Sequence, residues 1–257
     1  MDDNSFGGAL RAWRTRRRLS QLELALRAGT TQRHVSFMES GRSVPGRGMV
    51  VRVAESMSLP LRERNGLLLA AGYAASYPET ALDDVRLRPV LDGLQRLLDG
   101  HRPYPAVVVD RYGVLVASND GFAILTEGAA AELLKPPVNV LRLALHPHGM
   151  APRVRNLDAW ARHILERLHE ETARNPDARL DSLRSELEGY LPELTTSTET
   201  EHLGFAVPLR LSSSVGELRL ITAITTFATA VDVTITELKL ETFLPADDLT
   251  ADTLGRL

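Results

Sequence analysis

The stretch from Leu19 to Pro45 constrains the fold more than any other part of the chain, because it predicts two short helices joined by a tight turn. Ser20, followed three residues later by Glu23, has the spacing of a capping box, which begins the first helix. Gly29 ends that helix, since glycine readily adopts the left-handed conformation that a sharp reversal requires. A second helix follows over Thr31–Glu39, and the pair predicts a compact helical module.

The second helix combines an apolar face with a polar one. Thr30 is expected to cap it, Val35 and Met38 are spaced to face inward, and Gln32 and Arg33 lie outside the apolar seam. A side-chain amide can form two hydrogen bonds to adenine and a guanidinium two to guanine, each pair contributing roughly 1–3 kcal/mol of discrimination. Such a helix is suited to the major groove of DNA.

These residues resemble a known family. The match to the helix-turn-helix of the phage-repressor-like (Xre-type) regulators lies at Ser20-Gln21, Glu23, Leu24-Ala25, Gly29-Thr30-Thr31-Gln32 and Glu39-Ser40-Gly41. Residues 33–74 resemble, more narrowly, the DNA-binding half of the MmyB-like regulators. Residues 103–120 and 234–254 are similar to the ligand-binding domain of the same regulators, so the resemblance spans nearly the whole chain.

The resemblance implies roles for three polar residues of the helical module. Arg14 is expected to pair with Glu39 and so brace the second helix, as the matching residues do in the phage-repressor family. Gln21 stands in the first turn of its helix, where family members hold a phosphate with the backbone amide and the side chain. We therefore expect a structural role for Arg14 and a DNA contact for Gln21.

The loop after the second helix carries Arg42 and Arg47 between glycine and proline residues, a usual place for contacts to the DNA backbone. Phe37 stands where the family often has a polar residue. It either contacts a thymine methyl group or packs on a partner or on the following loop. The residues expected to contact DNA are Gln21, Thr31, Gln32, Arg33, Ser36, Phe37, Arg42 and Arg47.

Charge is distributed unevenly along the chain. Residues 1–75 hold 12 Arg and 6 acidic residues, a net +6, whereas residues 76–257 hold 18 basic and 27 acidic residues, a net −9. This asymmetry indicates a polyanionic partner for the first part, or simply an Arg-rich solvated surface. A length of 257 residues with 44% apolar residues can build two cores. We expect an all-α Xre-type helix-turn-helix (lambda-repressor-like) DNA-binding domain at 1–75, a connecting helix at 76–102 and a second domain at 103–257.

The second domain changes from a helical to a β period. An amphipathic helix is expected over Leu82–Leu98 before it, and further helices at 139–145, 158–174 and 180–191. The expected strands are Ala106–Asp110, Val114–Ala117, Phe205–Leu211, Leu218–Phe227 and Ile235–Phe243. This order predicts an α+β fold in which helices pack on one face of an antiparallel sheet. It resembles a PAS-like domain, the fold that the sensory half of the family is said to have.

A PAS-like sheet under a helical cover encloses a pocket, and its expected lining is apolar. The candidate ligand-binding residues are Val108, Leu115, Phe122, Leu125, Leu143, Trp160, Ile164, Phe205, Leu220, Ala223 and Phe227. The alternative is that they only fill a core. The resemblance implies a fatty-acid-like or other apolar small-molecule effector. A domain that binds a partner protein instead of a small molecule is the alternative function.

Residues that could support catalysis are sparse. The absence of cysteine excludes a disulfide, a thiolate metal site and a thiol nucleophile. His146 and His148 are close in sequence, but no third ligand follows at metal spacing. Ser212, Ser213 and Ser214 lack the G-x-S-x-G pattern of a nucleophile elbow. We therefore expect no enzyme activity, no catalytic residue, no bound metal and no cofactor.

Location and assembly follow from the same sequence. It holds no apolar run near the roughly 20 residues that a membrane span requires, and residues 1–8 lack a signal-peptide pattern, so we expect a cytoplasmic protein. One recognition helix reads only a few base pairs, so a homodimer on a double-stranded DNA operator is expected. The second domain is the expected source of the dimer contact, because it is larger and because charge repulsion opposes its association less.

Overall fold

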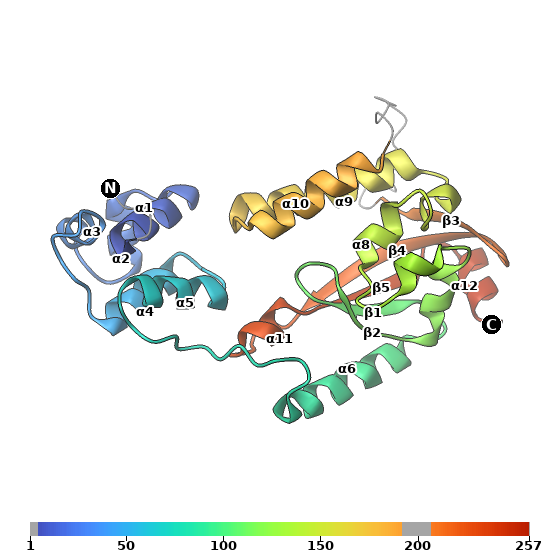
Figure 1. Cartoon of the computed structure of the whole chain (residues 1–257), viewed down its shortest axis with the longest axis horizontal. Helices are drawn as coiled ribbons and strands as arrows, with labels where there is room; N and C mark the ends of the chain where they lie inside the picture. Colours follow the sequence, from blue (N-terminus) through green and yellow to red (C-terminus); the bar gives the residue numbers. More distant parts are fainter. Residues whose placement is uncertain (1–4, 192–206, 257) are drawn as a thin grey trace. The chain divides into compact units, whose positions relative to one another are not determined.

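The computed structural model describes residues 5–191 and 207–256. The chain forms two compact units, which we call the N-terminal unit (Met1–Ala81 with Ala228–Thr236) and the C-terminal unit (Leu82–Phe227 with Glu237–Leu257). Both are drawn in Figure 1 and are considered separately below. None of the helices in these described ranges is long and apolar enough to cross a membrane.

The N-terminal unit begins with the expected helical module. Its helices are α1 (Phe6–Arg16), α2 (Gln21–Arg27), α3 (Gln32–Glu39), α4 (Arg47–Ser56) and α5 (Leu61–Ala70). The predicted capping box of α2 is confirmed, because Ser20 accepts from the Glu23 amide and Glu23 accepts from the Ser20 amide. Gly29 and Gly41 have φ values of 61° and 72°, as the two predicted helix ends require.

The cap of α3 differs by one residue from the prediction. Thr31 is the N-cap, and its hydroxyl accepts from the His34 amide at 3.1 Å. The Thr30 hydroxyl instead lies 2.9 Å from Nδ1 of His34. Two adjacent threonines offer equivalent hydroxyl groups, so the sequence could not distinguish between them.

A close approach between α1 and α3 depends on Gly7. A Cβ atom at this position would lie 2.7 Å from the carbonyl oxygen of Met38 and 2.8 Å from that of Glu39. Only glycine therefore allows the first turn of α1 to lie against the last turn of α3 without displacement of backbone. The contact fixes the end of α3 in the helical module.

The C-terminal unit contains a five-stranded antiparallel sheet. The strands are β1 (Ala106–Val109), β2 (Leu115–Ser118), β3 (Leu209–Ser213), β4 (Gly216–Thr226) and β5 (Lys239–Pro245). Their spatial order is β2-β1-β5-β4-β3, and each neighbouring pair is antiparallel. The order places the predicted first hairpin beside the last strand, and it confirms the expected PAS-like α+β fold.

Helices cover both faces of this sheet rather than one. The helical segments are η1 (Val85–Leu87), α6 (Arg88–Gly100), η2 (Asp120–Phe122), α7 (Ala123–Thr126), η3 (Ala131–Leu134), α8 (Val140–Leu145), η4 (Ala151–Arg153), α9 (Leu157–Arg174), α10 (Ala178–Gly189), α11 (Val233–Glu237) and α12 (Asp248–Leu254). Figure 1 shows α6 and α9 on opposite sides of the strands. The expected one-sided cover was wrong, because α6 contacts β1 and β2 through a second apolar surface.

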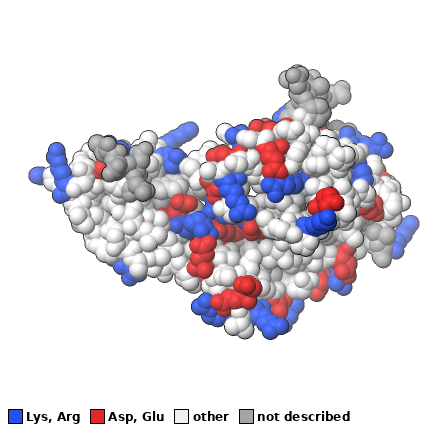
Figure 2. Space-filling view, in the orientation of Figure 1, with Lys and Arg blue, Asp and Glu red and all other residues white. Residues whose placement is uncertain are grey.

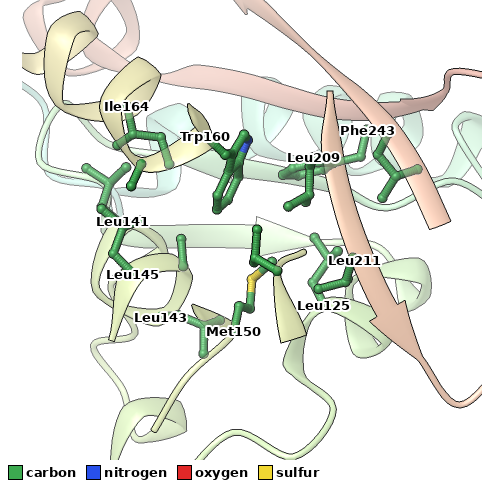
Figure 3. Packing of buried hydrophobic residues seen from close by; sticks show 14 of the residues in the cluster. Leu125, Leu141, Leu143, Leu145, Met150, Trp160, Ile164, Leu209, Leu211 and Phe243 are labelled. Carbon is green, nitrogen blue, oxygen red and sulfur yellow. The ribbon is translucent and has the colours of Figure 1, made fainter. Parts of the chain in front are cut away.

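The larger core lies between the sheet and α8 and α9. Figure 3 shows Trp160 among Ile164, Met150 and Phe243, with leucines from α8 and β3 around them. On the other face, Val108 and Leu240 are register partners and both are buried. The sheet is therefore apolar on both sides, and only the first side encloses the cavity described below.

Two predicted strands began in the wrong place. Ile235–Glu237 belongs to α11, because Asp232 accepts hydrogen bonds from the amides of Thr234 (2.9 Å) and Ile235 (3.4 Å) and so begins a helical turn. In the predicted strand Phe205–Leu211, Phe205 and Ala206 lie outside the described residues, and β3 begins at Leu209.

The connection between β4 and β5 belongs to the N-terminal unit. Asp232 Oδ2 accepts from the Thr80 hydroxyl at 2.6 Å and from the Thr80 amide at 3.3 Å, and the Val233 amide donates to the Pro78 carbonyl at 2.8 Å. The chain thus passes between the units three times, at Ala81, Phe227 and Thr236. The expected division into 1–75, 76–102 and 103–257 did not include the assignment of Ala228–Thr236 to the N-terminal unit.

Candidate DNA-binding surface and ligand pocket

Helix α3 presents the predicted polar face to solvent. Val35 and Met38 are buried in the core of the N-terminal unit, as expected, whereas Gln32 and Arg33 are exposed. Thr31 is also exposed at the start of the helix. The helix therefore offers an amide and a guanidinium at its N-terminal end, where recognition helices contact base edges.

A buried carboxylate holds α3 against α1 and α2. The Glu39 side chain has 0% exposure, and its Oε1 accepts from Nε of Arg14 at 2.5 Å. Its Oε2 accepts from Arg14 Nη2 at 3.1 Å and from Gln21 Nε2 at 2.8 Å, and Arg11 Nε lies 3.5 Å away. The predicted Arg14–Glu39 ion pair is confirmed.

The pKa of Glu39 lies below its ordinary value. Burial of the carboxyl group would by itself raise this pKa, but the hydrogen bonds from Arg14 and Gln21 and the positive charges of Arg14 and Arg11 outweigh it. Glu39 is therefore ionised at neutral pH in spite of its burial. The network joins three helices through one charge, so it positions the exposed face of α3.

Gln21 takes part in this network, which bears on its predicted DNA contact. Its side-chain nitrogen donates to Glu39, and the residue itself is half-buried at the first position of α2. Backbone amides in the first turn of a helix lack intrahelical acceptors and favour anions. A phosphate contact through the Gln21 backbone amide stays a prediction, and a contact through its side-chain nitrogen would compete with Glu39.

Phe37 packs between two arginines. The guanidinium carbon of Arg33 lies 5.1 Å from the ring centroid and that of Arg42 lies 6.0 Å from it. Phe37 thus packs on the following loop, one of the two alternatives left open by the sequence. Cation–π contacts of this kind orient a guanidinium, so Phe37 helps to position Arg33 beside the groove-facing surface.

The other expected DNA contacts are near the same surface. Ser36 is half-buried on α3, and Arg42 is exposed on the loop after it. Arg47, the first residue of α4, is exposed and donates to the Ser76 hydroxyl at 2.8 Å. The DNA-contact assignments themselves remain predictions.

Figure 2 shows basic and acidic side chains interspersed over the viewed face of the C-terminal unit, consistent with its mixed composition.

The C-terminal unit contains a cavity of about 110 Å³ between the sheet and the helices α8 and α9. Five of the predicted residues line it: Phe122, Leu125, Leu143, Trp160 and Ile164. The lining residues that the sequence did not predict are Val107, Val140, Leu141, Ala144, Met150, His163, Arg167, Thr222, Ile224, Glu241 and Phe243. Most of the wall is apolar, and Figure 3 shows several of these side chains converging.

Two predicted pocket residues lie on the other face of the sheet. Because side chains alternate along a strand, Val107, Thr222 and Ile224 face the cavity while Val108 and Ala223 face away from it. The period of two that begins at Leu218 and Leu220 in β4 continues through Thr222 and Ile224 and could have identified them. Ala223 was predicted because it is apolar, although it lies one residue out of step with this alternation.

The remaining predicted positions do not line the cavity either. Leu220 is buried in the same core beyond it, and Leu115 packs against that core while half-buried. Phe227 follows the end of β4 and is half-buried. Phe205 lies outside the described residues. For Leu115 and Leu220 the structure supports the alternative that the residue fills the core.

The cavity has one polar end, which the sequence did not predict. Helix α9 contributes His163 and Arg167, one turn apart, and β5 contributes Glu241. Arg167 Nη2 donates to Glu241 Oε1 at 3.4 Å, and the side chains are 32% and 9% exposed. The alternation of side chains along β5 puts Glu241 on the same face as Phe243, so it could have identified Glu241 but not its partner Arg167.

The two histidines of the loop after α8 lie close together. The rings of His146 and His148 lie 5.6 Å apart, and His146 contacts the Tyr190 ring edge-on at 4.7 Å. Across the described parts of the chain, no three His, Cys, Asp or Glu side chains gather as a metal ion would require.

The N-terminal unit, with a braced recognition helix, and the C-terminal unit, with a PAS-like sheet and an apolar cavity, define a helix-turn-helix transcription regulator with a ligand-binding domain. Residues 10–64 match the family described as Helix-turn-helix. Residues 90–257 match the family described as MmyB-like transcription regulator ligand binding domain, and the chain belongs to this family of regulators.

Two further similarities cover the chain unevenly. A protein of Sinorhizobium fredii, described as the uncharacterized HTH-type transcriptional regulator y4dL, is 44% identical over 52 residues. These residues are 20% of this chain and 26% of the relative, so the chain spans about a quarter of that protein. The solved structure of an RNA-binding light-oxygen-voltage receptor aligns with 96% of this chain and 62% of its own, at 15% identity. Its TM-score of 0.27 carries no structural argument.

Proposed function

We propose that this regulator binds a specific DNA operator and that a small apolar effector in the cavity of the C-terminal unit changes its operator affinity. The observation that carries the proposal is the presence, in one chain, of an exposed recognition helix and an apolar cavity with a single polar end. Apolar pockets with few convergent polar groups are the usual form of small-molecule sites.

The size of the cavity limits the effector. An engineered apolar cavity of about 150 Å³ holds benzene. The cavity here, at about 110 Å³, is smaller. An effector larger than a six-carbon ring would therefore exceed this volume, so that it would displace lining side chains or extend out of the cavity. A long-chain fatty acid would exceed it most. Met150 is the lining residue best suited to yield, because its unbranched thioether side chain adopts many shapes.

The proposed active form is a cytoplasmic homodimer. Two recognition helices on a two-fold axis would read half-sites about one DNA turn, or roughly 34–36 Å, apart. The C-terminal unit is the proposed source of the dimer contact. Sedimentation of the full chain at micromolar concentration tests this, and a monomer with full operator affinity would contradict it.

Native mass spectrometry of the purified full chain separates this function from its alternative. A retained adduct with the mass of a small apolar molecule supports the sensor. A co-purifying protein without such an adduct supports a C-terminal unit that binds a partner protein. The sensor is then tested with operator DNA, whose dissociation constant must change when the adduct is removed and restored.

A further inference from the structure

The polar end of the cavity is its opening to solvent. Along β4 the exposed fraction rises from 0% at Leu220 to 39% at Ile224. Glu241 is the register partner of Ile224, so it lies at this open end, and Arg167 faces it from α9. A ligand that enters the cavity with its apolar part inward would leave its polar group beside Arg167 and Glu241.

Charge at this opening is already balanced. Arg167 and Glu241, the Arg and carboxylate side chains that line the cavity, are paired with each other at 3.4 Å. One turn further along α9, Glu171 accepts from Nζ of Lys239 at 2.7 Å, and Lys239 precedes Glu241 by two residues on β5. Helix and strand thus carry two successive ion pairs of opposite orientation, in which the charges of these four side chains cancel.

This balance disfavours a charged ligand. A free carboxylate that accepted from Arg167 would bring a second negative charge beside Glu241, whose side chain is only 9% exposed. An ammonium group that donated to Glu241 would bring a second positive charge beside Arg167. Like charges at a partly buried site repel each other, so the pair works against a charged ligand of either sign.

A neutral hydroxyl group fits the same pair without this repulsion. It can donate to Glu241 and accept from Arg167 at once. The present contact of 3.4 Å is longer than the roughly 2.7–2.9 Å of a strong charge-assisted hydrogen bond, so both groups retain capacity for a further partner.

We propose that the pocket selects a neutral, hydroxyl-bearing apolar ligand and that Arg167 and Glu241 set this specificity. The inference rests on the proposed sensing function. It narrows the expected effector class, because a fatty acid carries a carboxylate at neutral pH.

Three six-carbon probes test the proposal on the full chain at pH 7: 1-hexanol, hexanoate and hexylammonium. They share the apolar part and differ in the charge of the polar group. The chain has two tryptophans, and Trp160 lines the cavity while Trp13 lies on α1, so the Trp160 indole N–H signal reports binding and that of Trp13 serves as reference. We expect 1-hexanol to bind more tightly than either ion by about tenfold or more.

Two variants then test the assigned residues. Glu241→Gln leaves Arg167 without a counter-charge and should shift the preference to hexanoate, whereas Arg167→Gln should shift it to hexylammonium. Glu171→Gln, which removes the neighbouring ion pair, should keep the wild-type ranking. An ion pair with a purely structural role would lower the affinity for all three probes alike.

The outcomes distinguish a failure of the hydroxyl specificity from a failure of the proposed sensing function. Hexanoate as the tightest wild-type ligand, or an unchanged ranking in both variants, would overturn the hydroxyl specificity and leave the pocket intact. If none of the probes perturbed Trp160, the ligand pocket itself would be refuted, and the sensing function with it.

Discussion

At the scale of single residues, the molecule depends most on Glu39. Replacing Arg14 by Met removes the main partner of a carboxylate that is 0% exposed, and loss of one partner from a buried pair costs about 3–5 kcal/mol. We expect the N-terminal unit to lose this much stability in urea unfolding. Arg11→Met is the matched control, because Arg11 is 48% exposed and 3.5 Å from Glu39, and it should cost less than about 1 kcal/mol. Equal losses in the two variants would contradict the network.

The same carboxylate makes stability depend on pH. Its pKa in the folded protein is below the ordinary 4.5, so its contribution is complete above pH 4.5 and is lost as pH falls through the lower, folded value. The difference in unfolding free energy between wild type and Glu39→Gln should therefore be larger at pH 7 than at pH 3. A difference independent of pH would show that the Glu39 charge contributes nothing.

At the scale of elements, α3 and the loop after it should act differently on DNA. Arg33→Ala should relax discrimination at one position per half-site by roughly 1–3 kcal/mol. Arg42→Ala should weaken binding to all sequences alike and reduce the salt slope by about one unit. Binding of both variants to an operator library measures the contrast. Indistinguishable profiles would refute the assignment of α3 as the recognition helix.

The elements also show which structural features could be predicted from the sequence. The capping box of α2, the glycine ends of α2 and α3 and the first hairpin were predicted correctly, because each depends on residues that are neighbours along the chain. The Arg14–Glu39 pair was available only through family resemblance. Local signals therefore predicted the helical module of the N-terminal unit well.

Features that depend on distant partners were predicted less well. The β-branched run at Ile235 suggested a strand, but the cap from Asp232 makes it helical. The alternation along β4 groups Thr222 with Ile224, but the pairing with β5, which places Thr222 opposite Phe243, decides that this face lines the cavity. The pairing of Arg167 with Glu241 joins residues 74 positions apart and has no local signature. Eleven of the sixteen residues that line the cavity were missed, those on β4 and β5 for these reasons.

At the scale of the whole molecule, the β4–β5 connection offers a route for coupling that the sequence did not reveal. These two strands line the cavity through Thr222, Ile224, Glu241 and Phe243, and the segment between them is part of the N-terminal unit. A change in the spacing of the strands would therefore reach the DNA-binding unit through the chain itself. The connecting helix was expected over Leu82–Leu98, and the structure shows it as α6 over Arg88–Gly100. This helix offers the other route.

Asp232→Ala tests the route through the β4–β5 connection, because it removes the hydrogen bonds from Thr80 that hold this connection. We expect operator affinity without ligand and ligand affinity without operator to be preserved, while the effect of each on the other falls. Asp247→Ala, which removes the cap of α12 at a distance along the chain, is the matched control and should keep the coupling. Full coupling in Asp232→Ala would assign the signal to the connecting helix alone.

The most direct measurement of the central claim is the operator dissociation constant of the full chain with and without 1-hexanol, in the wild type and in Ala144→Phe. Ala144 lines the cavity, so phenylalanine should fill it. We predict that 1-hexanol changes the wild-type constant by about 5–150-fold, the usual range of allosteric coupling, and leaves that of Ala144→Phe unchanged. A constant that 1-hexanol alters equally in both proteins, or in neither while Trp160 reports saturation, would contradict control of DNA binding through this cavity.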